Sequence, residues 1–108
     1  MILKSGAEIN NNAVINEISK IINQVYKLLP SREENLDWET PLSTIIQELS
    51  GMDRLLLDYH DILFALLCKL EGLFLLINEE DFFAYRRTIF ECLNLLSSLK
   101  ERVVTCKD

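Results

Sequence analysis

The residues with the clearest chemical potential stand together in the tetrapeptide Asp58–Asp61, which reads Asp-Tyr-His-Asp. A histidine beside carboxylates can hold a catalytic metal ion. Such sites collect several imidazoles, however, and His60 is the single histidine of the sequence. Carboxylates alone would suit magnesium or calcium, and the loop spacing that binds those ions is absent. We therefore expect no metal and no cofactor, and a helix-capping or surface role for the tetrapeptide.

Nucleophilic catalysis is disfavoured by spacing. Cys68 follows His60 by eight residues, which is about 12 Å along a helix, and an apolar neighbourhood raises the pKa of a thiol. Phosphotransfer domains, four-helix bundles with an exposed phosphorylatable histidine, carry Lys and Gly where this chain has Leu63 and Phe64. Three scattered glycines cannot form a phosphate-binding loop. The sequence predicts a protein that is not an enzyme.

The composition indicates one small domain with an excess of apolar residues. Hydrophobic residues make up 49% of the 108 positions, and the mean hydropathy is +0.13. Because a short chain buries only about two-thirds of its unfolded surface, this excess favours a partner chain. The three cysteines lack metal-binding spacing, and the first ten residues lack the apolar run of a signal peptide. We therefore expect a reduced, cytoplasmic protein.

The charge balance argues against nucleic-acid binding. The net charge is −6, whereas phosphate contacts need clustered Lys and Arg. Eight acids and one base lie between Glu33 and Asp61, while five bases and two acids lie between Phe82 and Lys107. These opposite charges can attract within the fold or across a dimer, or simply belong to solvated helix faces. The candidate basic patch comprises Arg86, Arg87, Lys100 and Arg102.

Helical periodicity predicts four helices after a flexible N-terminal arm, residues 1–10. The first helix spans Asn12–Leu29, and Pro30 ends it because the residue before a proline is pushed out of the helical region. The second begins at an N-cap, Thr40, and closes at Gly51, which suits the left-handed position after a helix.

The third predicted helix, which begins between Asp53 and Asp58 and ends near Ile77, is unusually apolar. Thirteen of the sixteen residues from Ile62 to Ile77 are apolar. A run of this length, interrupted by two charges and a glycine, is too short to span a membrane. A helix that is apolar on nearly every side is buried on nearly every side, and three other short helices scarcely enclose it. We therefore expect a second subunit to cover it.

The fourth predicted helix starts at Asn78, with three acids in its first turn, where they suit the helix dipole. Its apolar residues repeat at heptad spacing, as in a short coiled-coil seam or an amphipathic helix docked on its own core. The expected fold is all-α: a single domain, residues 11–108, forming a four-helix bundle completed by dimerisation. The candidate interface residues are Leu66, Leu70, Leu73, Phe74, Ile77, Phe82, Ile89 and Leu96.

Three features follow one another in roughly the last seventy residues. They are a short helix with spaced aliphatic residues, Leu42–Leu49, then an apolar helix with the run Leu66–Glu71, and then the acidic turn Glu79–Phe82 followed by Arg86-Arg87. In these features the chain resembles the small enterobacterial two-component connector proteins (AriR/YmgB-like), which are linked to biofilm formation and acid resistance. The resemblance implies a helical homodimer that modulates a sensor phosphorelay by protein contact. The long first helix is a departure from that family.

The leading hypothesis is a non-enzymatic regulatory module that acts through protein–protein contact, with a homodimer as its working form. The first alternative is a secretion chaperone or export adaptor with a hydrophobic client groove, since such proteins are also small, acidic and helical. The second is a DNA-associated regulator that uses the basic patch, which the acidic balance disfavours.

Overall fold

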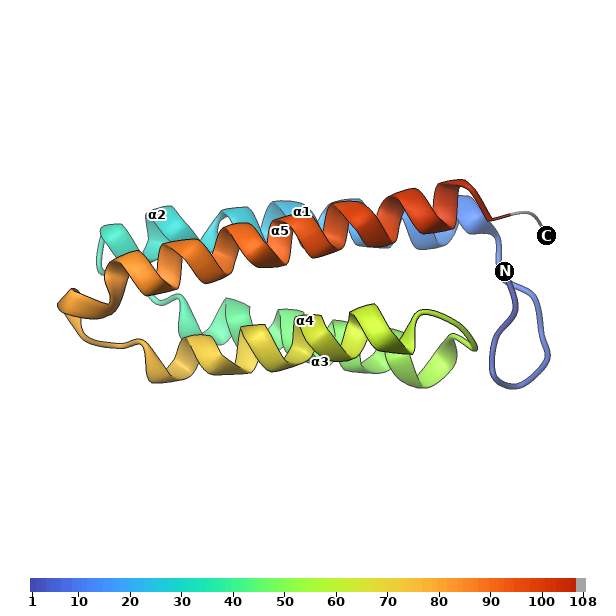
Figure 1. Cartoon of the computed structure of the whole chain (residues 1–108), viewed down its shortest axis with the longest axis horizontal. Coiled ribbons are helices and arrows are strands. Elements are labelled where there is room, and N and C mark those ends of the chain that lie inside the picture. The colour runs from blue at the N-terminus through green and yellow to red at the C-terminus, as the bar shows by residue number, and fades with distance from the viewer. Residues whose placement is uncertain (107–108) are drawn as a thin grey trace.

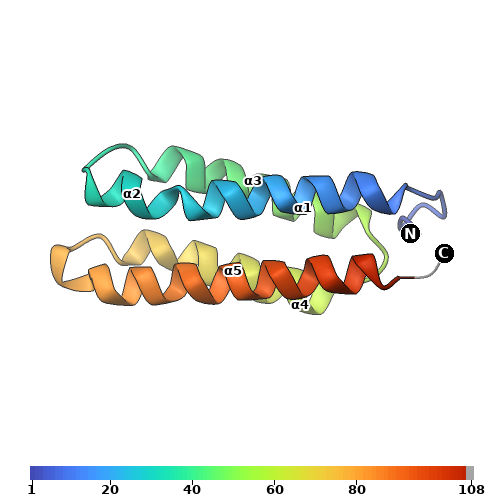
Figure 2. The ribbon, with the colours of Figure 1, turned by 90° about the horizontal axis from the view of Figure 1, so that it is seen from above.

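Four long helices run alternately up and down in the computed structural model, which describes residues 1–106. They are α1 (Asn11–Tyr26) with its short continuation α2 (Leu28–Glu33), α3 (Glu39–Leu55), α4 (His60–Gly72) and α5 (Phe82–Val104). Figure 1 places α1 and α5 in one layer and α3 and α4 in the other, and Figure 2 shows α1 beside α3 and α4 beside α5. The bundle measures 46 × 20 × 20 Å. The predicted all-α bundle is confirmed.

The first helix does not stop at Pro30, contrary to the prediction. Pro30 has no N–H to donate to the carbonyl of Tyr26, so the hydrogen-bonded helix α1 ends at Tyr26. The backbone nevertheless stays helical at Lys27, with φ −70° and ψ −14°. Pro30 then lies in the first turn of α2, where a missing N–H breaks no intrahelical bond. The proline therefore divides one predicted helix into two collinear ones and does not terminate it.

Both predicted ends of the second helix are wrong. The N-cap is Trp38, not Thr40. Oδ1 of the preceding residue, Asp37, accepts the backbone N–H groups of Glu39 and Thr40, each at 3.1 Å. Gly51 lies inside α3, and the helix continues to Leu55. Packing explains the extension, because Met52 continues the apolar stripe and packs against the core. That contact outweighs the cost of one helical glycine, about 1 kcal/mol.

The third predicted helix begins and ends differently in the structure. It starts only at His60, because Tyr59 adopts the left-handed conformation with φ 74°, and it ends at Gly72. A single 3₁₀ turn, η1 (Leu73–Leu75), follows.

A second 3₁₀ turn, η2 (Glu79–Asp81), precedes α5, so the fourth α-helix begins at Phe82 and not at Asn78. Asn78 makes no side-chain cap; its backbone carbonyl accepts the N–H of Asp81 at 3.0 Å.

The first ten residues, predicted to be a flexible arm, pack as a small hairpin against the α3–α4 connection. Isolated antiparallel bridges join Ile2 with Glu8 and Leu3 with Leu56. Gly6 turns the hairpin with φ 88°, a conformation that glycine adopts without strain. Met1 is buried in the core. Backbone bridges and the burial of Met1 therefore hold the segment for which a flexible arm was predicted.

The apolar side of α4 is covered by the chain itself. Its inward residues, with those of the other helices, form a continuous core. Five candidate interface residues belong to this core and are fully buried: Leu66, Leu70, Leu73, Ile89 and Leu96. Phe74 and Phe82 are partly buried, and Ile77 is exposed. The inward side of α4 is therefore covered within one chain, whereas Phe64 on its outer side is 57% exposed. Dimerisation stays a prediction.

Replacing Leu70 with alanine should lower the free energy of unfolding by about 3 kcal/mol, because the substitution leaves a cavity in a closely packed core. The matched control is Leu75→Ala, at a side chain that is 81% exposed, where the change should stay within about 0.5 kcal/mol. Urea denaturation followed by circular dichroism measures both. Equal losses in the two variants would contradict the packing of α4.

Acid should destabilise the wild type more than Asp37→Asn. The hydrogen bonds from Thr40 hold the pKa of Asp37 below its ordinary value of 3.8. The stabilisation is thus fully present above about pH 4 and is lost as the pH falls through the lower, folded-state pKa. Asparagine keeps an acceptor for the cap but does not titrate. Melting temperatures recorded from neutral to acid pH should converge for the two proteins in acid, and parallel profiles would refute the role of this carboxylate.

Candidate functional site

The tetrapeptide around His60 ties α4 to its neighbours. Nδ1 of His60 lies 2.8 Å from Oδ1 of Asp53 on α3, and Asp61 pairs with Arg102 on α5 at 3.2 Å. The His60 ring also lies 5.7 Å from that of Phe64. Within residues 1–106, no group of three or more His, Cys, Asp or Glu side chains is arranged to hold a metal ion. These contacts fix the start of α4.

The predicted basic patch divides into two separate pairs on α5. Arg86 and Arg87 lie near its start, and Lys100 and Arg102 lie about 20 Å further along the helix at its rise of 1.5 Å per residue. The Arg86 guanidinium stacks over the ring of Phe90 at 5.5 Å, and Arg102 is paired with Asp61. One chain therefore presents no continuous basic surface along this helix.

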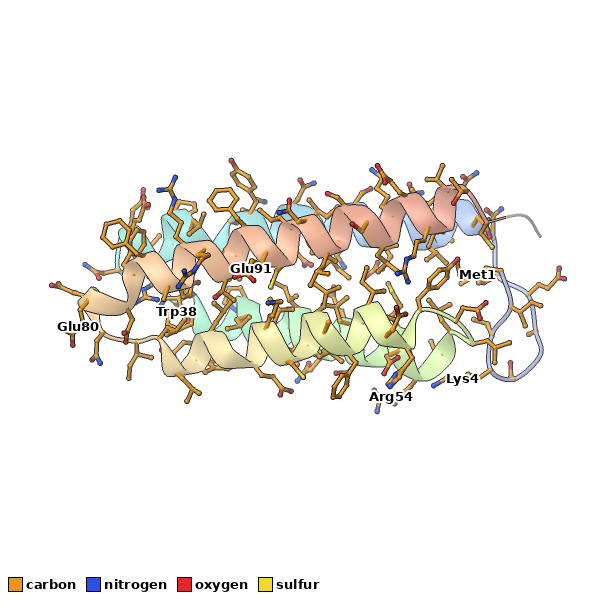
Figure 3. The ribbon with its side chains drawn as sticks, in the orientation of Figure 1. Met1, Lys4, Trp38, Arg54, Glu80 and Glu91 are labelled. Carbon is orange, nitrogen blue, oxygen red and sulfur yellow. The ribbon has the colours of Figure 1, made fainter. Side chains whose placement is uncertain are left out.

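The most distinctive surface lies at the end of the bundle opposite the N-terminus, where α2 connects to α3 and α4 to α5 (Figure 1). We call residues 32–39 together with residues 75–83 the acidic end. Figure 3 shows Glu80 at its tip and Trp38 set back toward the helices. The acidic end holds a single base, Arg32, and seven carboxylates: Glu33, Glu34, Asp37, Glu39, Glu79, Glu80 and Asp81.

Four large apolar side chains are exposed among these acids. Leu36 is 56% exposed, Ile77 64%, Phe83 79% and Leu75 81%. Large apolar side chains left open to solvent next to charged ones are typical of a surface that a partner covers. The acidic end therefore presents exposed apolar side chains among its carboxylates.

A cleft of about 560 Å³ opens between the two connections of the acidic end. Its apolar lining comes from Leu36, Trp38, Ile77 and Phe82, with Arg32 at its side. Three carboxylates border it: Glu33, Glu39 and Glu79. The cleft is large enough for one or two apolar side chains of a partner.

Arg32 holds the two sides of the cleft together. Nη2 of Arg32 donates to the backbone carbonyl of Asn78 at 2.8 Å, which joins α2 to the α4–α5 connection. The guanidinium carbon lies 4.3 Å from the ring centroid of Tyr85 and 5.7 Å from that of Trp38. Burial raises the pKa of Tyr85 to about 12, so this ring stays neutral beneath the cation. Arg32 therefore links the two connections that border the cleft.

Sequence reasoning found only part of this site. Of the candidate interface residues, Phe74, Ile77 and Phe82 lie at or beside the acidic end, and Phe74 stacks on Trp38 at 6.3 Å. Arg32 and Phe83 had no assigned role. The available signal was the presence of acid runs beside large apolar residues in both helix connections, but nothing in the sequence shows that these connections meet.

None of the helices in residues 1–106 is both long enough and apolar enough to cross a membrane. Comparison of the chain with protein-family models, with curated proteins and with solved structures gives no match.

The cysteines should differ sharply in reactivity. Burial raises the pKa of the Cys92 thiol to about 12, whereas Cys68 is exposed, and only a thiolate reacts with alkylating reagents. In a Cys106→Ser variant near pH 8, iodoacetamide should modify Cys68 first and reach Cys92 only when denaturant unfolds the protein. Mass spectrometry of peptides reads both sites. Prompt modification of Cys92 in the folded protein would contradict its position in the core.

Proposed function

We propose that this protein is a non-enzymatic protein–protein interaction module, and that its acidic end binds a partner segment in which basic side chains flank apolar ones. The observation that carries the proposal is the combination, at one end of the bundle, of seven carboxylates with four exposed large apolar side chains.

The two kinds of residue would contribute differently to binding. Covering an apolar side chain such as Ile77 or Phe83 supplies affinity, about 1.5–3 kcal/mol for a fully buried one. The carboxylates would mainly speed the approach of a cationic partner and exclude acidic ones. Arg32 keeps its positive charge, because the Asn78 carbonyl and the aromatic rings that it contacts are neutral, so one cation stands against the seven carboxylates of the acidic end.

A second copy of the chain is a poor occupant for the acidic end, because two such ends repel each other. The homodimer expected from the sequence stays a prediction, and it would need another face. The resemblance to two-component connector proteins makes a phosphorelay component one candidate partner, contacted without phosphoryl transfer. On this proposal the protein would regulate such a phosphorelay component in the cytoplasm by binding it.

Trp38, the single tryptophan, lines the cleft and serves as a built-in reporter. A synthetic amphipathic helix of Leu and Lys should change the Trp38 fluorescence on binding, and its affinity should fall as salt is added. The corresponding helix of Leu and Glu should not bind. Equal binding of the two peptides, or a salt-independent affinity, would refute the proposed chemistry.

Removing carboxylates from the acidic end tests whether the Leu-Lys helix binds there. The triple variant Glu33→Gln, Glu39→Gln, Glu79→Gln should bind the Leu-Lys helix about tenfold more weakly at low salt, since each exposed charge pair contributes about 0.2–1 kcal/mol. The matched control removes three exposed acids away from the acidic end: Glu8→Gln, Asp58→Asn, Glu101→Gln. Both variants have the same net charge. Equal weakening by the two would mean that net charge, and not this site, attracts the peptide.

A further inference from the structure

The outer side of α5 carries a second heptad stripe besides the one that faces the core. Its members follow one another at spacings of four and three residues, and every one of them is exposed: Phe83, Arg87, Phe90, Asn94, Ser97, Glu101 and Val104. Side chains with this spacing lie along one line of a helix, which is the pattern through which two helices pack. We call these residues the outer stripe. It is about 32 Å long at the rise of an α-helix.

The outer stripe is self-complementary when two copies of α5 lie antiparallel with the two-fold axis close to Asn94. The facing pairs are then Phe83 with Val104, Arg87 with Glu101, Phe90 with Ser97, and Asn94 with its own copy. An apolar side chain thus meets an apolar one, a cation meets an anion, and a large ring meets a small side chain. A parallel pair would instead set Arg87 against Arg87 and Glu101 against Glu101, and like charges repel.

The charges and apolar groups of the outer stripe are available for this contact. The salt bridges within residues 1–106 use neither Arg87 nor Glu101. Glu91, one turn after Arg87, is already paired with Lys69 at 2.8 Å. At the two ends of the stripe, the side chain of Phe83 is 79% exposed and that of Val104 is 59% exposed.

A hollow of about 260 Å³ marks the place that Glu101 of a second copy would enter. It is lined by Phe83, Arg86, Arg87 and Phe90, so that two guanidinium groups border it. The Arg86 guanidinium is held over the Phe90 ring. The hollow shares no lining residue with the cleft of the acidic end. A second copy on the outer stripe therefore leaves that cleft open.

We propose that two copies of this chain form an antiparallel dimer through the outer stripes of their α5 helices. The two acidic ends then lie at opposite ends of the dimer, which avoids the repulsion between them. Because the contact is two-fold symmetric, each favourable pair occurs twice. A single pair of helices is a small interface, so the dimer is weak, with a dissociation constant of about 10 µM.

Charge reversal tests the proposal on the full chain, by sedimentation equilibrium from about 1 µM to about 1 mM. The wild type should pass from monomer to dimer in this range. Arg87→Glu and Glu101→Arg should each weaken the dimer about tenfold, because each sets like charges against each other. The double variant restores opposite charges in reversed order and should recover wild-type affinity. A monomer throughout, or a double variant as weak as the single ones, would overturn the proposal.

The matched control is Arg54→Glu, the same charge change at an exposed residue that Figure 3 shows on the other layer of the bundle. It should leave the affinity within about twofold of the wild type, since a charge outside the contact changes only the long-range field. Circular dichroism melts check that each variant is folded. Equal weakening by Arg54→Glu and Arg87→Glu would mean that net charge, and not the outer stripe, governs association.

One contact opposes the dimer and gives a test of opposite sign. Arg86 and Lys100 flank the outer stripe on the same side, and each faces the copy of the other across the axis, where like charges repel. Lys100→Gln should therefore tighten the dimer about threefold, as expected for one exposed charge pair on each side of the axis. A weaker dimer, or an unchanged one, would contradict this register.

Cysteine substitution tests the direction of the helices. In a Cys68→Ser, Cys106→Ser background, diamide should join the two copies of an Asn94→Cys variant, because position 94 lies beside the axis. Ser97→Cys should not be joined, since its copy lies about 10 Å further along the helix, beyond the reach of a disulfide. Non-reducing gels read both variants. Equal joining through Ser97→Cys would show a parallel pair and overturn the proposal.

The dimer and the acidic end are tested separately. The double variant Arg87→Glu, Glu101→Arg keeps the net charge of the chain and every residue that lines the cleft. Failure of the outer-stripe dimer would therefore leave binding of the Leu-Lys helix as a separate question, and failure of that binding would leave the dimer.

Discussion

The burial of α4 by the other three helices is the constraint on which the rest of the structure depends. Leu63, Leu66, Leu70 and Leu73 are fully buried, and each such side chain contributes about 1.5–3 kcal/mol. One chain completes this core without help. The outer surface is therefore free to carry carboxylates and isolated apolar residues whose positions folding does not dictate. Any partner must be recognised at that surface, because the interior is already filled.

Arg32 gives this surface its shape at one end. It comes from the short helix that follows the proline break, and its guanidinium reaches the carbonyl of Asn78, 46 positions away in the sequence. Stacking on Tyr85 and Trp38 holds the cation in place, an interaction worth about 0.5–2 kcal/mol. The two acidic connections, which would repel each other, are thus held together. The carboxylates of both connections therefore lie on one surface.

The sequence by itself determined that the chain is all-α, where its four main helices lie, and that it is strongly acidic between Glu33 and Asp61. Those properties follow from local periodicity and composition. Only the tertiary structure decided that α3 continues through Gly51, that Met1 is buried, and that Leu66 and Leu70 face this chain's own core. Periodicity identifies the apolar side of a helix but not the element that covers it, and helix ends shift when packing outweighs local propensity. The acidic end is likewise a tertiary feature, because two connections far apart in sequence must meet to form it.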